Sequence, residues 1–151
     1  MTSAPDSGID IVQLAREAYQ CGWSRTSDVS VSTRESQAIS KDWQSHVRTA
    51  GGERFSCEVK VSDEFRERID LIDHMTATAY EMKVSGKNPT HEFFKDVFKI
   101  LEHNLSRRGR IKRLVFITDS AGVKRLGTGL GRSLLENSHD LGFEIKLEPL
   151  D

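Results

Sequence analysis

The chain has few cysteines, the residues whose disulfide bonds stabilise small secreted proteins, and it lacks the long apolar runs that cross membranes. Its two cysteines, Cys21 and Cys57, are too few for a disulfide scaffold or for a zinc site made of cysteines. No apolar run approaches the roughly 18 residues of a transmembrane helix. Because residues 1–11 show neither the basic nor the apolar segment of a secretory signal, we expect a cytoplasmic protein.

Net charge is also nearly absent, although the charges are unevenly distributed. The 22 Lys and Arg residues almost balance the 23 Asp and Glu residues, so the formal charge is −1. This total gives no general argument for binding nucleic acid. Residues 83–113, in contrast, carry a local excess of basic side chains, which makes this segment a candidate phosphate-binding surface.

The length of 151 residues, 36% of them hydrophobic, fits a single domain with its own core. We expect an N-terminal extension with a short helix over residues 1–31 and one folded domain over residues 32–151. Apolar spacing in this domain predicts a helix, three strands, a helix, a strand, a helix and a strand, over residues 32–50, 55–59, 68–73, 78–84, 88–105, 114–117, 129–139 and 143–147. Three consecutive strands disfavour a purely parallel sheet, so we predict an α/β fold with a mixed sheet flanked by helices on both faces.

Two of these elements carry definite packing expectations. The run Leu114–Ile117 is apolar without interruption, which is typical of a strand buried on both faces. The helix that begins at Asn88-Pro89 is expected to face the sheet through one apolar stripe. That stripe consists of Phe93, Phe94, Val97, Phe98, Leu101 and Leu105.

The segment from Arg68 to Lys87 carries the chemically most informative side chains. Asp70 lies in one strand of a predicted hairpin, and Glu81 and Lys83 lie two residues apart in the next strand, on one face. Their neighbours are mostly apolar, and a buried Glu or Lys is costly unless it is paired or binds a metal. Two carboxylates from adjacent strands could bind a hard divalent cation such as Mg²⁺, beside a lysine that orients a water molecule. The alternative is an ordinary Glu–Lys pair on an exposed strand face.

The element order, with Asp70 in the first hairpin strand and Glu81-Met82-Lys83 in the second, resembles the PD-(D/E)xK nuclease superfamily, whose fold is called restriction endonuclease-like. The resemblance covers about residues 32–118. It implies a nuclease that depends on Mg²⁺ or Mn²⁺, with Asp70, Glu81 and the Met82 carbonyl as metal ligands. Lys83 would position the attacking water, and DNA is the expected substrate, with RNA left open.

Two acidic positions in this resemblance have alternatives. Asp73 is a rival to Asp70, but it lies beside the predicted turn, where Asp commonly bonds the local backbone, so we favour Asp70. Members of the superfamily often carry a Glu on the first core helix, and Glu35 extends the inward apolar stripe of residues 39–47. Glu35 also ends an S-x-x-E capping box, in which it would bond backbone donors rather than complete the site.

The local basic excess supplies the expected contacts with nucleic acid. Its members beyond the hairpin are Lys87, Lys95, Lys99, Arg107, Arg108, Arg110, Lys112 and Arg113. A chain of this size leaves little room for a separate recognition domain, so we expect a homodimer or a partner protein, as in restriction, phage defence or recombination. Two other classes stay open. One is a noncatalytic nucleic-acid-binding or assembly module that keeps the nuclease fold, and the other is a structural α/β protein in which these charges meet by accident.

Overall fold

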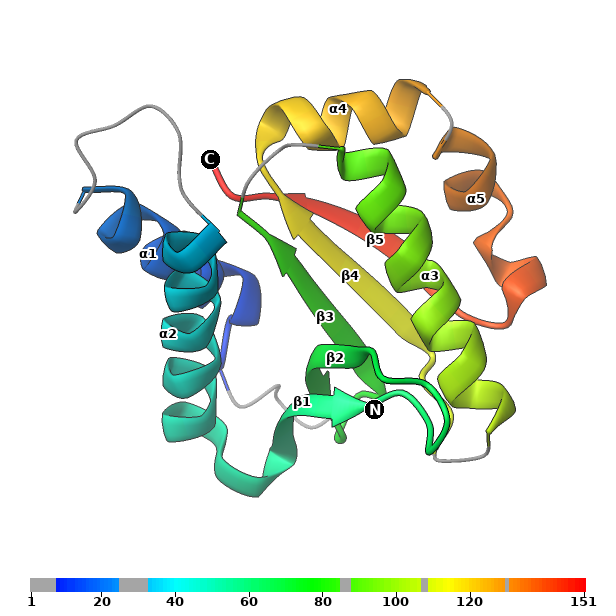
Figure 1. The fold of residues 1–151 in the computed structure, drawn as a ribbon, viewed down its shortest axis with the longest axis horizontal. Coiled ribbons are helices and arrows are strands. Elements are labelled where there is room, and N and C mark those ends of the chain that lie inside the picture. The colour runs from blue at the N-terminus through cyan, green and yellow to red at the C-terminus, as the bar shows by residue number, and fades with distance from the viewer. Residues whose placement is uncertain (1–7, 25–32, 85–87, 107–108, 130) are drawn as a thin grey trace, which may run out of the picture.

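The computed structural model describes residues 8–24, 33–84, 88–106, 109–129 and 131–151. Figure 1 shows a central sheet with helices on either side of it. The helices are α1 (Ile11–Ser24), α2 (Thr33–Gly51), α3 (Pro89–Leu105), α4 (Ser120–Thr128) and α5 (Arg132–Glu136). The strands are β1 (Phe55–Lys60), β2 (Arg68–Asp73), β3 (Thr78–Lys83), β4 (Arg113–Thr118) and β5 (Glu144–Pro149). None of the described helices is long and apolar enough to pass through a lipid bilayer.

The strands form one mixed sheet in the order β1-β2-β3-β4-β5. Neighbours are antiparallel from β1 to β3, whereas β4 runs parallel to both β3 and β5. Parallel neighbours need long connections, and α3 and then α4 with α5 provide them. In Figure 1, α1 and α2 cover one face of the sheet, and α3, α4 and α5 cover the other. The predicted α/β fold with a mixed sheet flanked by helices is therefore confirmed.

Two apolar cores hold the helices against the sheet. In the core beneath α1 and α2, the buried Trp43 donates a hydrogen bond from its indole N–H to the carbonyl oxygen of Ile11 at 3.0 Å. In the core beneath α3, Phe93 meets Phe116 edge to face, with ring centroids 5.4 Å apart. The residues of β4 divide between the two cores, with Val115 in the first and Phe116 in the second. Burial of this strand on both faces is thus confirmed.

The inward face of α3 differs from the predicted stripe. Phe94, Phe98 and Leu105 were expected to face the core, but they are 37%, 55% and 77% exposed. Polar side chains are buried on this helix instead, together with Phe93, Val97 and Ile100. They are Asp96, Lys99 and His103. The stripe prediction was wrong for three of its residues because α3 is apolar on two sides, and hydropathy alone does not show which side meets the sheet.

The helix expected over residues 129–139 is confirmed in part, because the shorter α5 lies within this range, but α4 before it was missed. α4 begins directly after β4, where Asp119 Oδ1 accepts a hydrogen bond from the Gly122 backbone N–H at 2.7 Å and caps the helix. Gly129 ends α4, and the shorter α5 follows it. The glycines therefore mark a break between two helices. At the other end of the chain, α1 is the helix expected within residues 1–31 and ends at Ser24, and residues 25–32 lie outside the described part of the chain.

Candidate functional site

The sheet opens into a fork between β2 and β3. These strands pair with each other over residues 71–73 and 78–80. Beyond that point, residues 68–69 pair with β1 and residues 81–83 pair with β4. Backbone groups inside the fork face a gap rather than a neighbouring strand, so they need other hydrogen-bond partners.

Asp70 and Glu81 meet inside this fork and supply those partners. Glu81 Oε1 accepts a hydrogen bond from the Asp70 backbone N–H at 3.2 Å. In return, Asp70 Oδ2 accepts one from the Met82 backbone N–H at 3.0 Å. The structure therefore brings together the two acidic residues that the sequence placed on adjacent strands.

The third strand at this place, β1, carries a strained residue. Glu58 has a φ of +50°, in the left-handed region that residues with a side chain rarely adopt and that costs about 1–3 kcal/mol. Its carboxylate accepts a hydrogen bond from Gln44 Nε2 of α2 at 3.1 Å, and its carbonyl oxygen accepts one from Arg68 Nη1 at 3.0 Å. These bonds hold the strained backbone and aim the Glu58 side chain toward α2.

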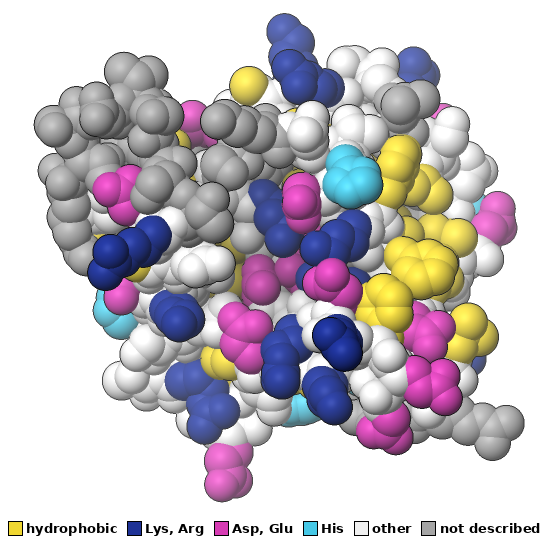
Figure 2. Space-filling view, in the orientation of Figure 1, with side chains coloured by type: hydrophobic (Ala, Val, Ile, Leu, Met, Phe, Trp, Pro, Cys, Tyr) yellow, Lys and Arg dark blue, Asp and Glu magenta, His cyan; other side chains and the backbone are white. Residues whose placement is uncertain are grey.

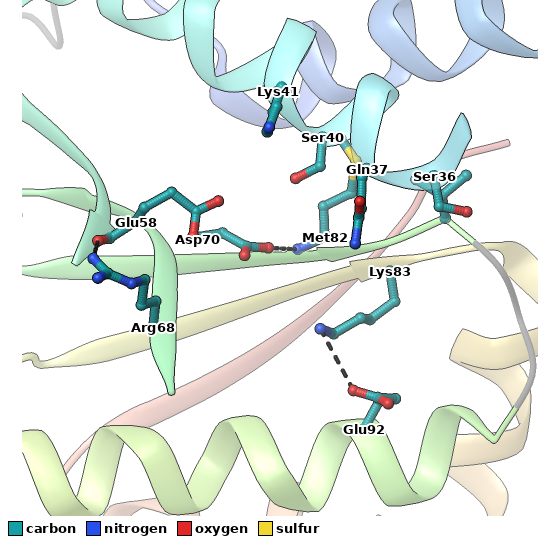
Figure 3. Close-up of a pocket in the computed structure, with 11 residues that line it drawn as sticks. Ser36, Gln37, Ser40, Lys41, Glu58, Arg68, Asp70, Met82, Lys83 and Glu92 are labelled. Carbon is teal, nitrogen blue, oxygen red and sulfur yellow. Dashed lines mark hydrogen bonds and ion pairs between the residues drawn. The ribbon is translucent and has the colours of Figure 1, made fainter. Parts of the chain in front are cut away.

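A cleft of about 610 Å³ lies over the fork, between α2 and α3. Figure 2 shows basic and acidic side chains gathered in the middle of this face of the molecule. The lining residues are Ser36, Gln37, Ser40 and Lys41 from α2, Glu58, Arg68, Asp70, Met82, Lys83 and Val84 from the sheet and its end, and Glu92 from α3. In Figure 3, Gln37 and Lys41 point from α2 toward the strands. The cleft thus joins carboxylates on its floor to hydrogen-bond donors on its wall.

Two lysines connect the floor of the cleft to α3. Lys83 Nζ lies 3.5 Å from Glu92 Oε2 and 3.9 Å from Asp96 Oδ2. Lys99 Nζ, which is buried, lies 3.2 Å from Glu81 Oε1 and 3.0 Å from Asp96 Oδ1. Asp96 therefore bridges the partly exposed lysine of the cleft and the buried lysine behind it.

The electrostatic balance of this network favours an additional positive charge. Burial, together with the nearby charges of Asp70 and Asp96, raises the pKa of Glu81 well above its usual value. Burial also raises the pKa of Asp96 to about 6, although Lys83 and Lys99 act in the opposite direction. Burial lowers the pKa of Lys83, but the three carboxylates outweigh this effect and raise it. Three acids thus share two ammonium groups, and the raised pKa values of Glu81 and Asp96 mean that these two carboxyl groups hold their protons more tightly than usual.

The donor atoms could accommodate a Mg²⁺ or Mn²⁺ ion. Among the described residues, no group of three or more His, Cys, Asp and Glu side chains is arranged to hold a metal. Mg²⁺ does not require such a group, because it keeps several waters and binds through one or two carboxylates and substrate phosphates. Asp70 lines the cleft, whereas Glu81 is fully buried and is not among the lining residues, and its Oε2 accepts no hydrogen bond from the described residues. The oxygen atoms of these two carboxylates are of the kind that such an ion prefers, while coordination by them and by the Met82 carbonyl stays a prediction.

The two alternative acidic positions lie in different surroundings. Asp73 is buried away from the cleft, with its two carboxylate oxygens 2.9 Å and 2.8 Å from the Arg54 guanidinium. It also accepts hydrogen bonds from the Met75 N–H and the Thr76 hydroxyl, so it organises the β2–β3 turn. Glu35 lies half-buried in the first turn of α2 and is not among the described residues that line the cleft. That helix presents other residues to the site.

The predicted basic surface is divided by the fold. Lys99 is only 3% exposed, so its expected contact with nucleic acid was wrong. Lys95 lies 3.3 Å from Glu67 on the outside of α3. Arg113 pairs in register with Thr78, at the opposite end of β3 from the fork. Arg110 and Lys112 precede it and are exposed, whereas Lys87, Arg107 and Arg108 lie outside the described residues.

Sequence reasoning missed several residues of the cleft. Lys41 and Glu58 come from elements that carry no recognisable motif, so no local signal identified them. Glu92 and Asp96 were missed although they precede the predicted Lys99 at spacings of four and three, which places three charged residues on one face of α3. That spacing could have predicted a charged helix face toward the sheet.

Comparisons with known proteins add no relative to this geometry. No family model matches the chain, and searches of curated proteins and of solved structures found no match. The functional argument therefore rests on the site itself.

The different surroundings of Asp70 and Asp73 predict different stabilities for their alanine variants. Asp73→Ala should lower the free energy of unfolding by about 3 kcal/mol, because it leaves Arg54 without its buried partner. Asp70→Ala should change it by less than about 1 kcal/mol, because relief of its repulsion with Glu81 offsets the loss of its hydrogen bond from the Met82 N–H. Urea unfolding of the two variants tests this, and equal losses would contradict the structural role of Asp73.

The raised acid pKa values predict that the metal-free protein loses stability as pH rises. In EDTA, the native state holds a proton on Asp96 up to about pH 6, whereas the unfolded state releases it near its ordinary value of 3.8. The native state therefore binds more protons in this window, and stability should fall by roughly 2 kcal/mol between pH 4.5 and 7.5. Asp96→Asn should flatten this fall, which urea unfolding at each pH measures. The exposed control Asp140→Asn should keep it, and an unchanged fall in Asp96→Asn would contradict the assignment.

Proposed function

We propose that the protein is a metal-dependent nuclease that hydrolyses phosphodiester bonds of DNA. The observation that carries this proposal is the pair of backbone hydrogen bonds that brings Asp70 and Glu81 together in the fork, with Asp70 and Lys83 lining the same cleft. This arrangement agrees with the resemblance of the sequence to the PD-(D/E)xK superfamily. A cleft open to solvent, with acids on the floor and donors on the wall, suits an extended anionic substrate.

Asp70 and Glu81 would hold a Mg²⁺ or Mn²⁺ ion, with the Met82 carbonyl as a further ligand. When bound, such an ion polarises a phosphodiester and lowers the pKa of a coordinated water. The excess of acidic over basic groups supports this assignment, and so does the Glu81 Oε2, which accepts no hydrogen bond from the described part of the chain. Lys99 holds the other oxygen of Glu81 and so fixes the direction in which the free oxygen points.

Lys83 acts as a hydrogen-bond donor rather than as a base. Its raised pKa keeps the ammonium group protonated at neutral pH, so it carries no free electron pair to accept a proton. From its place in the cleft it orients the attacking water and opposes the negative charge that develops on the phosphate. Glu92, which lies 3.5 Å from this ammonium group in the free protein, holds it until the substrate arrives.

The wall of the cleft supplies contacts for the sugar–phosphate backbone. Lys41 and Arg68 are exposed basic residues on opposite sides of Asp70, and Ser40 and Gln37 add neutral donors. Donors of these kinds contact phosphate oxygens without distinguishing the bases. We therefore expect weak sequence preference from this chain alone.

A noncatalytic nucleic-acid-binding module is a second candidate, and one observation favours it. Both acids already have partners in the fork, since Glu81 Oε1 accepts from Lys99 Nζ and Asp70 Oδ2 accepts from the Met82 N–H. A module that keeps the fold without cleavage could use Lys99 in place of a metal. The two candidates differ in whether added metal changes the site.

Cleavage assays should separate these candidates. With Mg²⁺ or Mn²⁺, the wild-type protein should cleave plasmid DNA, and EDTA should abolish the reaction. Lys83→Ala should reduce the rate by about 100-fold or more, because it removes a donor to the transition state, and Glu81→Gln should reduce it further. Single-stranded DNA and RNA tested in parallel define the substrate.

Lys112→Ala serves as the matched control, because Lys112 is an exposed lysine just before β4, away from the cleft. Its cleavage rate should equal that of the wild type. Equal rates in the wild type, Lys83→Ala and Glu81→Gln would refute the nuclease proposal. Binding of DNA without cleavage under either metal would favour the noncatalytic module.

The cleft also predicts which lysines bind DNA. Lys41→Ala should weaken binding of a short duplex by about fivefold at low salt and reduce the salt dependence by roughly one ion, because one phosphate contact is lost. Lys112→Ala should leave both quantities unchanged. Fluorescence anisotropy at several salt concentrations measures them, and a larger effect of Lys112→Ala would place the DNA at the other end of the sheet.

A further inference from the structure

The outer face of α3 carries an apolar stripe that the fold leaves largely exposed. Phe94, Phe98 and Leu105 are 37%, 55% and 77% exposed, and Leu101 lies between them, partly buried. On a helical projection these residues fall within one narrow sector, opposite the buried Asp96. Figure 2 shows the corresponding hydrophobic side chains together over α3, beside the charged cleft. Exposed patches of this kind commonly mark interaction sites.

The spacing of the stripe is that of a coiled-coil seam. Successive members from Phe94 to Leu105 are four, three and four residues apart, which is the alternation of d and a positions in a heptad. α3 has 17 residues and is about 25 Å long, so the stripe runs along most of its length. A helix with such a seam pairs with another helix that presents the same seam.

The charges beside the stripe select the partner and its direction. We propose that α3 packs antiparallel against α3 of a second copy of this chain, forming a homodimer. Lys95 and Glu102 lie on the same flank of the stripe, seven residues apart, and their midpoint nearly coincides with that of the stripe. In an antiparallel pair related by a two-fold axis, Lys95 faces Glu102 of the partner subunit, and the reverse contact repeats it. A parallel pair would place this flank against Val97 and Asn104, which carry no charge.

The neighbouring structure extends this surface. Phe65, in the connection between β1 and β2, lies against Phe98 with ring centroids 6.0 Å apart. Glu67 of the same connection lies 3.3 Å from Lys95, in an exposed pair that can exchange partners. The stripe covers only part of the roughly 800 Å² per partner that a stable interface needs. We therefore expect reversible dimerisation at concentrations of about 1–100 µM.

The proposed interface leaves the cleft open and does not rest on the proposed function. Glu92, the residue of α3 that lines the cleft, projects from the side of the helix opposite the stripe. Two copies joined through α3 therefore keep both clefts accessible. A protein without nuclease activity, including the Lys83→Ala variant, should dimerise like the wild type.

Sedimentation equilibrium over 1–200 µM tests the seam. Phe98→Glu and Leu105→Ser should each raise the dissociation constant at least tenfold, because each removes apolar contact from the seam. Met75→Ser is the matched control, since Met75 is a comparably exposed apolar residue (59%) in the β2–β3 turn. It should change the constant by less than twofold. Circular dichroism should show that each variant is folded, and Leu105→Ser, at the most exposed position, covers the case in which Phe98→Glu does not fold.

Charge exchange tests the antiparallel direction. Lys95→Glu and Glu102→Lys should each raise the dissociation constant about threefold or more, because each places like charges opposite one another. The double variant Lys95→Glu/Glu102→Lys should return to within about twofold of the wild type. A monomeric wild type at 200 µM would overturn the dimer. Equal weakening by Met75→Ser would overturn the seam, and a double variant weaker than either single one would overturn the antiparallel arrangement.

Discussion

This site depends on the interactions that the buried ammonium group of Lys99 makes. It contacts Glu81 and Asp96, and it donates a hydrogen bond to the carbonyl oxygen of Arg68 at 2.8 Å. Without it, two fully buried carboxylates would lie together in an apolar core without enough compensating charge, which is strongly unfavourable. One side chain of α3 thereby contacts both strands of the fork, β2 through the Arg68 carbonyl oxygen and β3 through Glu81. This end of the sheet is organised by charge pairing, whereas the rest is organised by apolar packing.

Much of the fold follows from local patterns in the sequence. Strands repeat at two residues and helices at about 3.6, so apolar spacing located α2 and the five strands within a few residues. α4 was missed although Asp119, directly after a buried strand, is a typical helix cap. The orientation of α3 was not predictable from its own residues, because both of its sides are apolar. Its inward side is selected by Glu81 and by the Arg68 carbonyl, which are distant in sequence.

The residues of the site also divide into those that local sequence patterns identify and those that only tertiary packing brings together. Asp70, Glu81 and Lys83 could be placed together from the sequence because they lie on neighbouring strands. Their relative positions follow from residue spacing over a short stretch of chain. Lys41 and Glu58 enter the cleft from elements that only tertiary packing brings near. The local excess of basic residues does not form one surface, and the reason is topological. A charge count ignores the direction of the strands, and the start of a strand lies far from the end of its parallel neighbour. Arg113 begins β4 and Lys83 ends β3, so the basic residues before β4 lie at the opposite end of these strands from Lys83.

The fork also shortens the pairing between β2 and β3, which affects how the two sides of the sheet are connected. β2 and β3 are joined across residues 71–73 and 78–80, a shorter run of pairing than at the other junctions of the sheet. α2 packs on the β1 side of this junction, while α3 packs mainly on β3 and β4. Main-chain pairing therefore couples the two sides of the sheet less strongly at this junction than elsewhere, and the apolar core that α2 shares with Leu71 and Met82 supplies the rest of the connection. Because Lys41 of α2 and Lys83 of β3 lie on different sides of this junction, a bend of the sheet there would change the distance between these two lysines of the cleft.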